Sequence, residues 1–144
     1  MSGPLLQLMA RIITHIPDDG DVTLVVLKGH LVVAEELNAA VASRVAHPQF
    51  LPQAELEFDQ LLCVAKSEYF AKTNAWVWGA ARKLNSIRNL YAHNIEPDNI
   101  ADRLDEFLQL VEGHVGNERA SAHERLRRGI AMLAAQIHHL HSTP

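Results

Sequence analysis

The sequence contains little cysteine, no long hydrophobic run and no surplus of positive charge. Cys63 is the only cysteine among 144 residues, so no internal disulfide can form, and this scarcity favours a reducing compartment such as the cytoplasm. The apolar runs are far shorter than the roughly 18 residues that a membrane helix needs, and no secretory signal is expected, so no membrane partner is predicted. A formal net charge of −4 argues against a dedicated double-stranded DNA binder, which usually carries a strong basic surplus.

Several motifs of catalysis and metal binding are also missing. The sequence has no glycine-rich phosphate loop, no Cys-x-x-Cys or His-Glu-x-x-His motif, and no nucleophile in a recognisable setting. Cys63 falls on an apolar stripe, which predicts a buried thiol. Among nine histidines, His138 and His141 are three residues apart, but no further ligands accompany them in the sequence. A solvated tail is therefore predicted there, with no metal site and no cofactor, and the pair Glu35-Glu36 is interpreted as a solvated helix face.

The dominant pattern in the sequence is the repetition of apolar residues at helical spacing. Apolar side chains recur at three- and four-residue steps over six segments, which short turns separate. The stretch 22–27 alone would also fit a buried strand, but its apolar pattern continues to about residue 45 and favours a helix. With 48% hydrophobic residues and no linker, residues 1–144 are predicted to form a single all-α domain, a helical bundle of about six helices. The expected helices lie at about residues 5–13, 22–45, 54–67, 74–93, 99–112 and 118–141.

Local features set the expected helix ends and contacts. Asp19 or Asp21 is expected to cap the second helix, and Gly113 and Gly116 are expected to break the chain after the fifth. Two prolines at 47–52 predict a loop, since prolines so close are not expected inside a helix. Gly29 is expected to allow a neighbouring helix to approach closely. In the third helix the expected core-facing residues are Leu56, Phe58, Leu61, Leu62 and Val64.

The sharpest polar feature is the segment from Arg88 to His93, Arg-Asn-Leu-Tyr-Ala-His, at the end of the fourth expected helix. An ideal helix separates the Arg88 and His93 side chains by about 140°, so they converge only if the helix unwinds near Ala92. The pattern fits a functional polar site. It also fits a structural helix end, in which both side chains interact with the terminal carbonyl groups and the helix dipole.

This segment resembles the HEPN family, small all-helical proteins marked by an arginine, four to six intervening residues and a histidine. Arg88-Asn89-x-x-x-His93 matches the form Arg-Asn-x-x-x-His that is common in that family. The resemblance covers about residues 20–115, including a long antiparallel helix pair at 22–45 and 74–93. It implies a metal-independent endoribonuclease, often a toxin of a toxin–antitoxin or phage-defence system, that works as a homodimer with both motifs in one cleft.

The resemblance also implies a role for each residue of the motif. Arg88 would bind the phosphate and stabilise its growing charge, and His93 would act as acid or base near neutral pH. Asn89 would orient either group through a hydrogen bond. Because the chain is acidic overall, RNA binding would need local positive charge, for which Lys28, Arg82 and Lys83 are the candidates.

A second interpretation is a non-catalytic helical interaction protein, such as an immunity, antitoxin-associated or regulatory partner. The segment 27–37, Leu-Lys-Gly-His-Leu-Val-Val-Ala-Glu-Glu-Leu, is similar to mannitol-repressor-like helical transcriptional regulators. The surface near Arg88 and Glu35 would then bind a cognate toxin or antitoxin protein, or form an internal salt bridge. An open cleft at Arg88 and His93 across a dimer axis favours catalysis, and pairing of both within one chain favours interaction.

Overall fold

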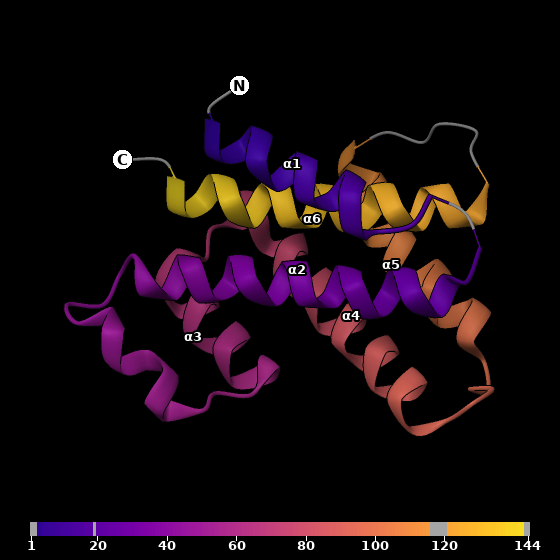
Figure 1. The fold of residues 1–144 in the computed structure, drawn as a ribbon, viewed down its shortest axis with the longest axis horizontal. Coiled ribbons are helices and arrows are strands. Elements are labelled where there is room, and N and C mark those ends of the chain that lie inside the picture. The colour runs from indigo at the N-terminus through magenta and orange to yellow at the C-terminus, as the bar shows by residue number, and fades with distance from the viewer. Residues whose placement is uncertain (1–2, 19, 116–120, 143–144) are drawn as a thin grey trace.

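Six α-helices and two short 3-10 helices form the described part of the protein, which contains no strand (Figure 1). The computed structural model describes residues 3–18, 20–115 and 121–142. The predicted all-α helical bundle is therefore confirmed. Within these residues, no helix combines the length and the apolar character that crossing a membrane requires. In chain order the elements are α1 (Gly3–His15), α2 (Val22–Ala42), η1 (Pro48–Ala54), α3 (Phe58–Tyr69), η2 (Lys72–Asn74), α4 (Ala75–His93), α5 (Ile100–Val115) and α6 (Ala122–Ser142).

The central element is α2, which contacts α1, α3, α4 and α6. Its principal partner is α6, which lies beside it (Figure 1). The two helices run parallel, because Gly29 lies against Ile130 and, two turns later on both helices, Glu36 hydrogen-bonds His138. The close approach expected at Gly29 is confirmed: a Cβ atom there would lie 2.7 Å from Cδ1 of Ile130.

The antiparallel pairing expected of residues 22–45 and 74–93 is present between α2 and α4, which cross obliquely (Figure 1). His30 in the middle of α2 hydrogen-bonds Asn85 of α4. Thr23 at the start of α2 lies beside Tyr91 near the end of α4. The end of α4, where the Arg88 motif lies, is therefore fixed against the first half of α2.

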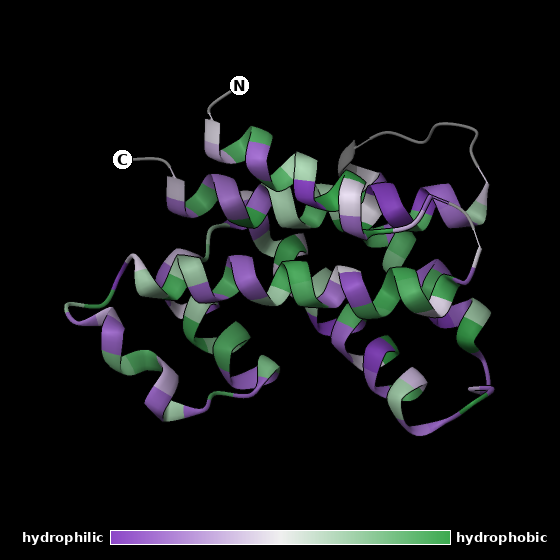
Figure 2. Cartoon of the chain, in the orientation of Figure 1, coloured by the Kyte–Doolittle hydropathy of each residue, from purple (hydrophilic) through white to green (hydrophobic). Residues whose placement is uncertain are grey.

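Every helix carries both hydrophobic and hydrophilic residues (Figure 2), and the hydrophobic ones meet in one core. This follows from the helical period, which gathers apolar side chains into a stripe that is stable only when buried. The largest fully buried side chains are Ile16, Val25, Val26, Leu37, Leu62, Leu84, Ile87, Phe107, Leu126, Ile130, Leu133 and Ile137.

Polar side chains cap the starts of two helices. Asp21 caps α2, as expected, because its carboxylate accepts a hydrogen bond of 2.9 Å from the Thr23 backbone. The other candidate, Asp19, lies outside the described residues. Ser121 precedes α6 and accepts a hydrogen bond from the Glu124 backbone, so this helix begins later than the predicted residue 118.

The prediction of a loop at 47–52 is wrong, since Pro48–Ala54 is the 3-10 helix η1. Proline is tolerated at the first position of a helix, where its missing N–H has no partner to lose. At the two ends of η1, the N–H of Phe50 donates to the carbonyl of His47 and the N–H of Glu55 donates to that of Pro52. The third α-helix consequently starts at Phe58, four residues later than expected.

The predicted orientation of α3 is also partly wrong. Its buried residues are Leu61, Leu62, Ala65 and Tyr69, which share one face. Cys63 lies on the opposite side and is exposed, and Leu56 and Val64 are exposed as well. Gly113 does not break α5, because the helix continues to Val115, and Gly116 lies outside the described residues.

Candidate functional site

The Arg88 motif occupies the last turns of α4, which remains helical through His93. Asn94 ends the helix, and both its backbone N–H and its side-chain amide donate to the carbonyl of Leu90, at 2.9 and 3.2 Å. The unwinding near Ala92 that would bring Arg88 and His93 together is therefore absent. Arg88 lies half-buried on the inward side of α4, whereas His93 is exposed. No hydrogen bond or ion pair joins them among the described residues.

Arg88 has no carboxylate partner within the described part of the chain. Its Nη1 donates a hydrogen bond of 3.2 Å to Oδ1 of the neutral Asn89 side chain. Other cations of the protein are paired with glutamates, namely Arg11 with Glu35, Lys83 with Glu106, and Arg125 with Glu112. A half-buried guanidinium without a counterion favours binding of an anion, since partial burial strengthens the electrostatic attraction.

Behind Arg88, three side chains from α2, α3 and α4 form a polar cluster, here called the His30 cluster: His30, Asp59 and Asn85. The Asn85 amide nitrogen donates to Asp59 Oδ1 at 3.2 Å, so its oxygen faces His30. That oxygen lies 2.9 Å from Nε2 of His30, which must carry the proton of this hydrogen bond. The chain of hydrogen bonds thus places a proton on Nε2 of His30.

His30 is buried, and its ring stacks on Phe58 with a centroid distance of 4.3 Å. Burial lowers the pKa of His30 below its ordinary value of 6.5. The hydrogen bond with Asn85 opposes this decrease in pKa, and the positive charge of Arg88 adds to it. Burial and the nearby positive charge both favour the uncharged form of His30, so Arg88 provides the positive charge of this region.

The three cations predicted to bind substrate are not gathered around Arg88. Lys83 points toward α5, where its ammonium lies 2.7 Å from Glu106 in an exposed ion pair. Lys28 precedes His30 by two residues on α2, so the two side chains point about 160° apart. Arg82 is exposed on α4, almost two turns before Arg88. A basic surface around Arg88 within one chain would have to come from other residues.

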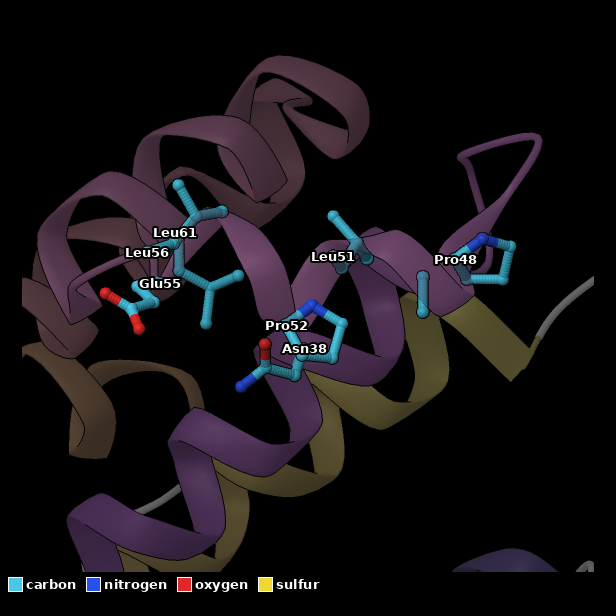
Figure 3. Close-up of a pocket in the computed structure, with 8 residues that line it drawn as sticks. Asn38, Pro48, Leu51, Pro52, Glu55, Leu56 and Leu61 are labelled. Carbon is cyan, nitrogen blue, oxygen red and sulfur yellow. The ribbon is translucent and has the colours of Figure 1, made fainter.

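A pocket of about 480 Å³ lies between the end of α2, η1 and the start of α3 (Figure 3). Its lining is mainly apolar, with Asn38 and Glu55 as the polar side chains. None of the predicted catalytic or substrate-binding residues lines it, and no nucleophile–base pair is present in it. Its lining residues are Asn38, Ala42, Pro48, Leu51, Pro52, Glu55, Leu56 and Leu61.

A second polar cluster, the α2–α6 triad, consists of Glu36, His138 and His141. One carboxylate oxygen of Glu36, Oε2, lies 3.1 Å from Nδ1 of His138 and 2.9 Å from Nε2 of His141. Only 7% of Glu36 and 7% of His138 is exposed. The predicted solvated tail is therefore wrong, because α6 packs its last turns against α2. The solvated helix face is confirmed for Glu35, which is exposed and pairs with Arg11, and is wrong for Glu36.

The sequence drew attention to Arg88 and to the pair His138 and His141, but it did not reveal Glu36 as the partner of that pair or the His30 cluster. A histidine within the apolar α2 and an asparagine within the apolar stripe of α4 were the available signals for the His30 cluster. Scans against protein-family models, curated proteins and solved structures found no match for this chain. The assignment of function therefore rests on the residues and their geometry.

Proposed function

We propose that this protein is a HEPN-like, RNA-directed protein in which Arg88 binds a phosphodiester and His93 acts in metal-independent cleavage. The observation that carries the proposal is the half-buried Arg88 guanidinium, which has no carboxylate partner among the described residues and is hydrogen-bonded only to the neutral Asn89. Its planar fork matches the geometry of a phosphate, the anion that RNA repeats at every nucleotide. A cytoplasmic location fits this role, and the single cysteine is consistent with such a reducing compartment.

The chemistry requires one base and one acid. The base removes the proton of the ribose 2′-hydroxyl, whose oxygen then attacks the adjacent phosphorus. The acid gives a proton to the departing 5′-oxygen, so that a 2′,3′-cyclic phosphate and a free 5′-hydroxyl result. An exposed histidine such as His93 suits either role near neutral pH, and Arg88 would stabilise the negative charge that grows on the phosphate.

One chain does not provide this arrangement, because α4 is unbroken through His93 and its rotation keeps Arg88 and His93 apart. We propose that a two-fold homodimer supplies it, with Arg88 of one chain opposite His93 of its partner. In each of the two sites, one His93 would act as the base or the acid, and solvent water would take the other role.

The first test is cleavage of a labelled single-stranded RNA by the purified protein in the presence of EDTA. Cleavage is expected from the wild type, and His93→Ala should abolish it. Arg88→Lys keeps the charge but loses the planar fork, so reduced cleavage is expected. Arg128→Ala removes a cation that pairs with Glu124 on α6 and serves as a matched control. Undiminished cleavage by His93→Ala would remove His93 from the mechanism.

The second test is subunit complementation. When the inactive variants Arg88→Ala and His93→Ala are mixed in equal amounts, half of the dimers are mixed, and each mixed dimer contains one intact site. Activity should return to about one quarter of the wild-type level. A mixture that stays inactive, although exchange of subunits is demonstrated, would exclude a site shared between the two chains.

The second candidate is a non-catalytic interaction protein, for example a partner of a cognate toxin or antitoxin. The observation that favours it is the lack of added positive charge around Arg88, since Lys83 pairs with Glu106 and neither Lys28 nor Arg82 is gathered there. In this case the wild type would cut no RNA, and Arg88→Ala would weaken binding of the protein encoded by a neighbouring gene. The first test therefore separates the two candidates.

A further inference from the structure

The α2–α6 triad combines three metal-ligating side chains at the interface of two packed helices. His138 and His141 are three residues apart on α6, so both rings extend from one face of that helix. Glu36 reaches them from α2, and the donor atoms of the three side chains all lie within 4.8 Å of one another. The two imidazole rings are 5.0 Å apart and nearly perpendicular.

A buried carboxylate is costly to desolvate unless a positive charge or several hydrogen bonds compensate it. Within the described residues, no lysine or arginine pairs with Glu36, whose partners are the two histidines. A cation held between the carboxylate and the two rings would compensate this buried negative charge.

We infer that Glu36, His138 and His141 bind a divalent transition-metal ion, with Zn²⁺ as the best match to the ligands. Two imidazoles and one carboxylate, with water as a fourth ligand, form an established zinc coordination set. A tetrahedral site with metal–ligand distances of about 2.0–2.1 Å separates its ligand atoms by roughly 3.3–3.4 Å. The present separations of 3.1 and 2.9 Å between Glu36 Oε2 and the two ring nitrogens need to widen by only a few tenths of an ångström.

The ion would join the end of α6 to the middle of α2. Its ligands differ from the residues of the Arg88 motif and of the His30 cluster, and Glu36 follows His30 on α2 by nearly two turns. The metal site is therefore independent of the proposed cleavage, which proceeds in EDTA. Failure of either proposal leaves the other unaffected.

The test is a titration of the EDTA-treated, dialysed full-length protein with Co²⁺, followed by Zn²⁺. One Co²⁺ per chain is expected to produce visible d–d bands of low-coordinate cobalt, and one equivalent of Zn²⁺ should abolish them. Because the ion binds the folded state, a hundredfold excess of Zn²⁺ over its Kd should raise Tm by about 5–10 °C.

Two variants and a matched control locate the site. Glu36→Gln and His141→Gln each remove one ligand, and each should weaken Co²⁺ binding by roughly a hundredfold or more. His139→Gln removes the exposed histidine between the two ligands and should bind like the wild type. A wild type that binds no Co²⁺, or a Glu36→Gln variant that binds it as tightly as the wild type, would overturn the inference.

Imidazole NMR of the ¹⁵N-histidine-labelled wild type decides the question if the variants fail to fold. One equivalent of Zn²⁺ should shift the ring signals of His138 and His141. Shifts confined to other histidines would refute the site.

Discussion

The contact between Gly29 of α2 and Ile130 of α6 makes a quantitative prediction for the substitution Gly29→Ala. A Cβ atom at position 29 would lie 2.7 Å from Cδ1 and 2.8 Å from Cγ2 of Ile130. The Cδ1 atom can rotate away, but Cγ2 is attached to the branched Cβ and moves only with the backbone or with a change of χ1. Because Ile130 is fully buried, no free space is available for that movement.

Two opposing effects determine the magnitude. Overpacking of a tight core usually costs about 1–3 kcal/mol. Alanine is favoured over glycine inside a helix by roughly 0.5–1 kcal/mol. Gly29→Ala is therefore expected to lower the free energy of unfolding by about 1–2 kcal/mol. At Gly79 of α4 the nearest atom to a new Cβ, Cδ1 of Leu110, is 3.9 Å away, so Gly79→Ala should raise stability by roughly 0.5–1 kcal/mol.

Urea unfolding followed by far-UV circular dichroism measures both free energies. A double-mutant cycle with Ile130→Ala, which removes all the clashing atoms, should show that Gly29→Ala is no longer destabilising in that background. Ile130→Val removes Cδ1 but keeps Cγ2 and should rescue only in part. Equal effects of alanine at Gly29 and Gly79, or strict additivity in the Ile130→Ala background, would refute the packing argument.

Three further predictions concern single side chains. Since the pKa of His30 is lowered in the folded state, the unfolded state binds more protons below pH 6.5, and the free energy of unfolding falls as the pH falls below that value. Urea unfolding at pH 7.5 and 5.5 should therefore show a larger loss of stability for the wild type than for His30→Gln. Equal losses of stability would contradict the burial argument. Tyr69→Phe removes a hydroxyl that donates to the carbonyl of Ala40 at 2.8 Å, and it should lower the free energy of unfolding by about 1 kcal/mol in the same assay. This is the low end for a buried hydrogen bond, because Ser43 also donates to that carbonyl. A loss above about 3 kcal/mol would contradict this account. Cys63 is exposed and should react fully with a thiol reagent in the native protein. Reaction only in denaturant would show that its thiol is buried.

The sequence was most informative where one apolar stripe runs without interruption between clear end signals. The helix expected at 74–93 is observed as α4, Ala75–His93, and Asp21 caps α2 as expected. The region around α3 was predicted less well, because it contains more apolar residues than its buried face can hold. Leu56 and Val64 are hydrophobic like Leu61, and the positions of the neighbouring helices α2 and α4 decide which of them is covered.

The polar clusters likewise depend on contacts between helices, which the local sequence does not reveal. Glu35 and Glu36 are adjacent and chemically identical, yet a rotation of about 100° around α2 makes one an exposed partner of Arg11 and buries the other beside His138. The local sequence shows which side chains are present, but it does not show which side chains of two helices about one hundred residues apart will contact each other. The Arg88 motif could be recognised because all its residues lie on one helix, and its function remains a proposal for the experiments above.

The parallel packing of α2 and α6 has a consequence for the order in which the protein folds. Parallel neighbours cannot be joined by a tight turn, and here Glu36 and His138, separated by 102 positions, are linked through α3, α4 and α5. Closing so long a loop is entropically unfavourable until the intervening helices are in place. During synthesis α2 therefore emerges well before its principal partner, and the apolar surface that α6 covers stays open to water or to a chaperone until the ribosome has completed the sixth helix.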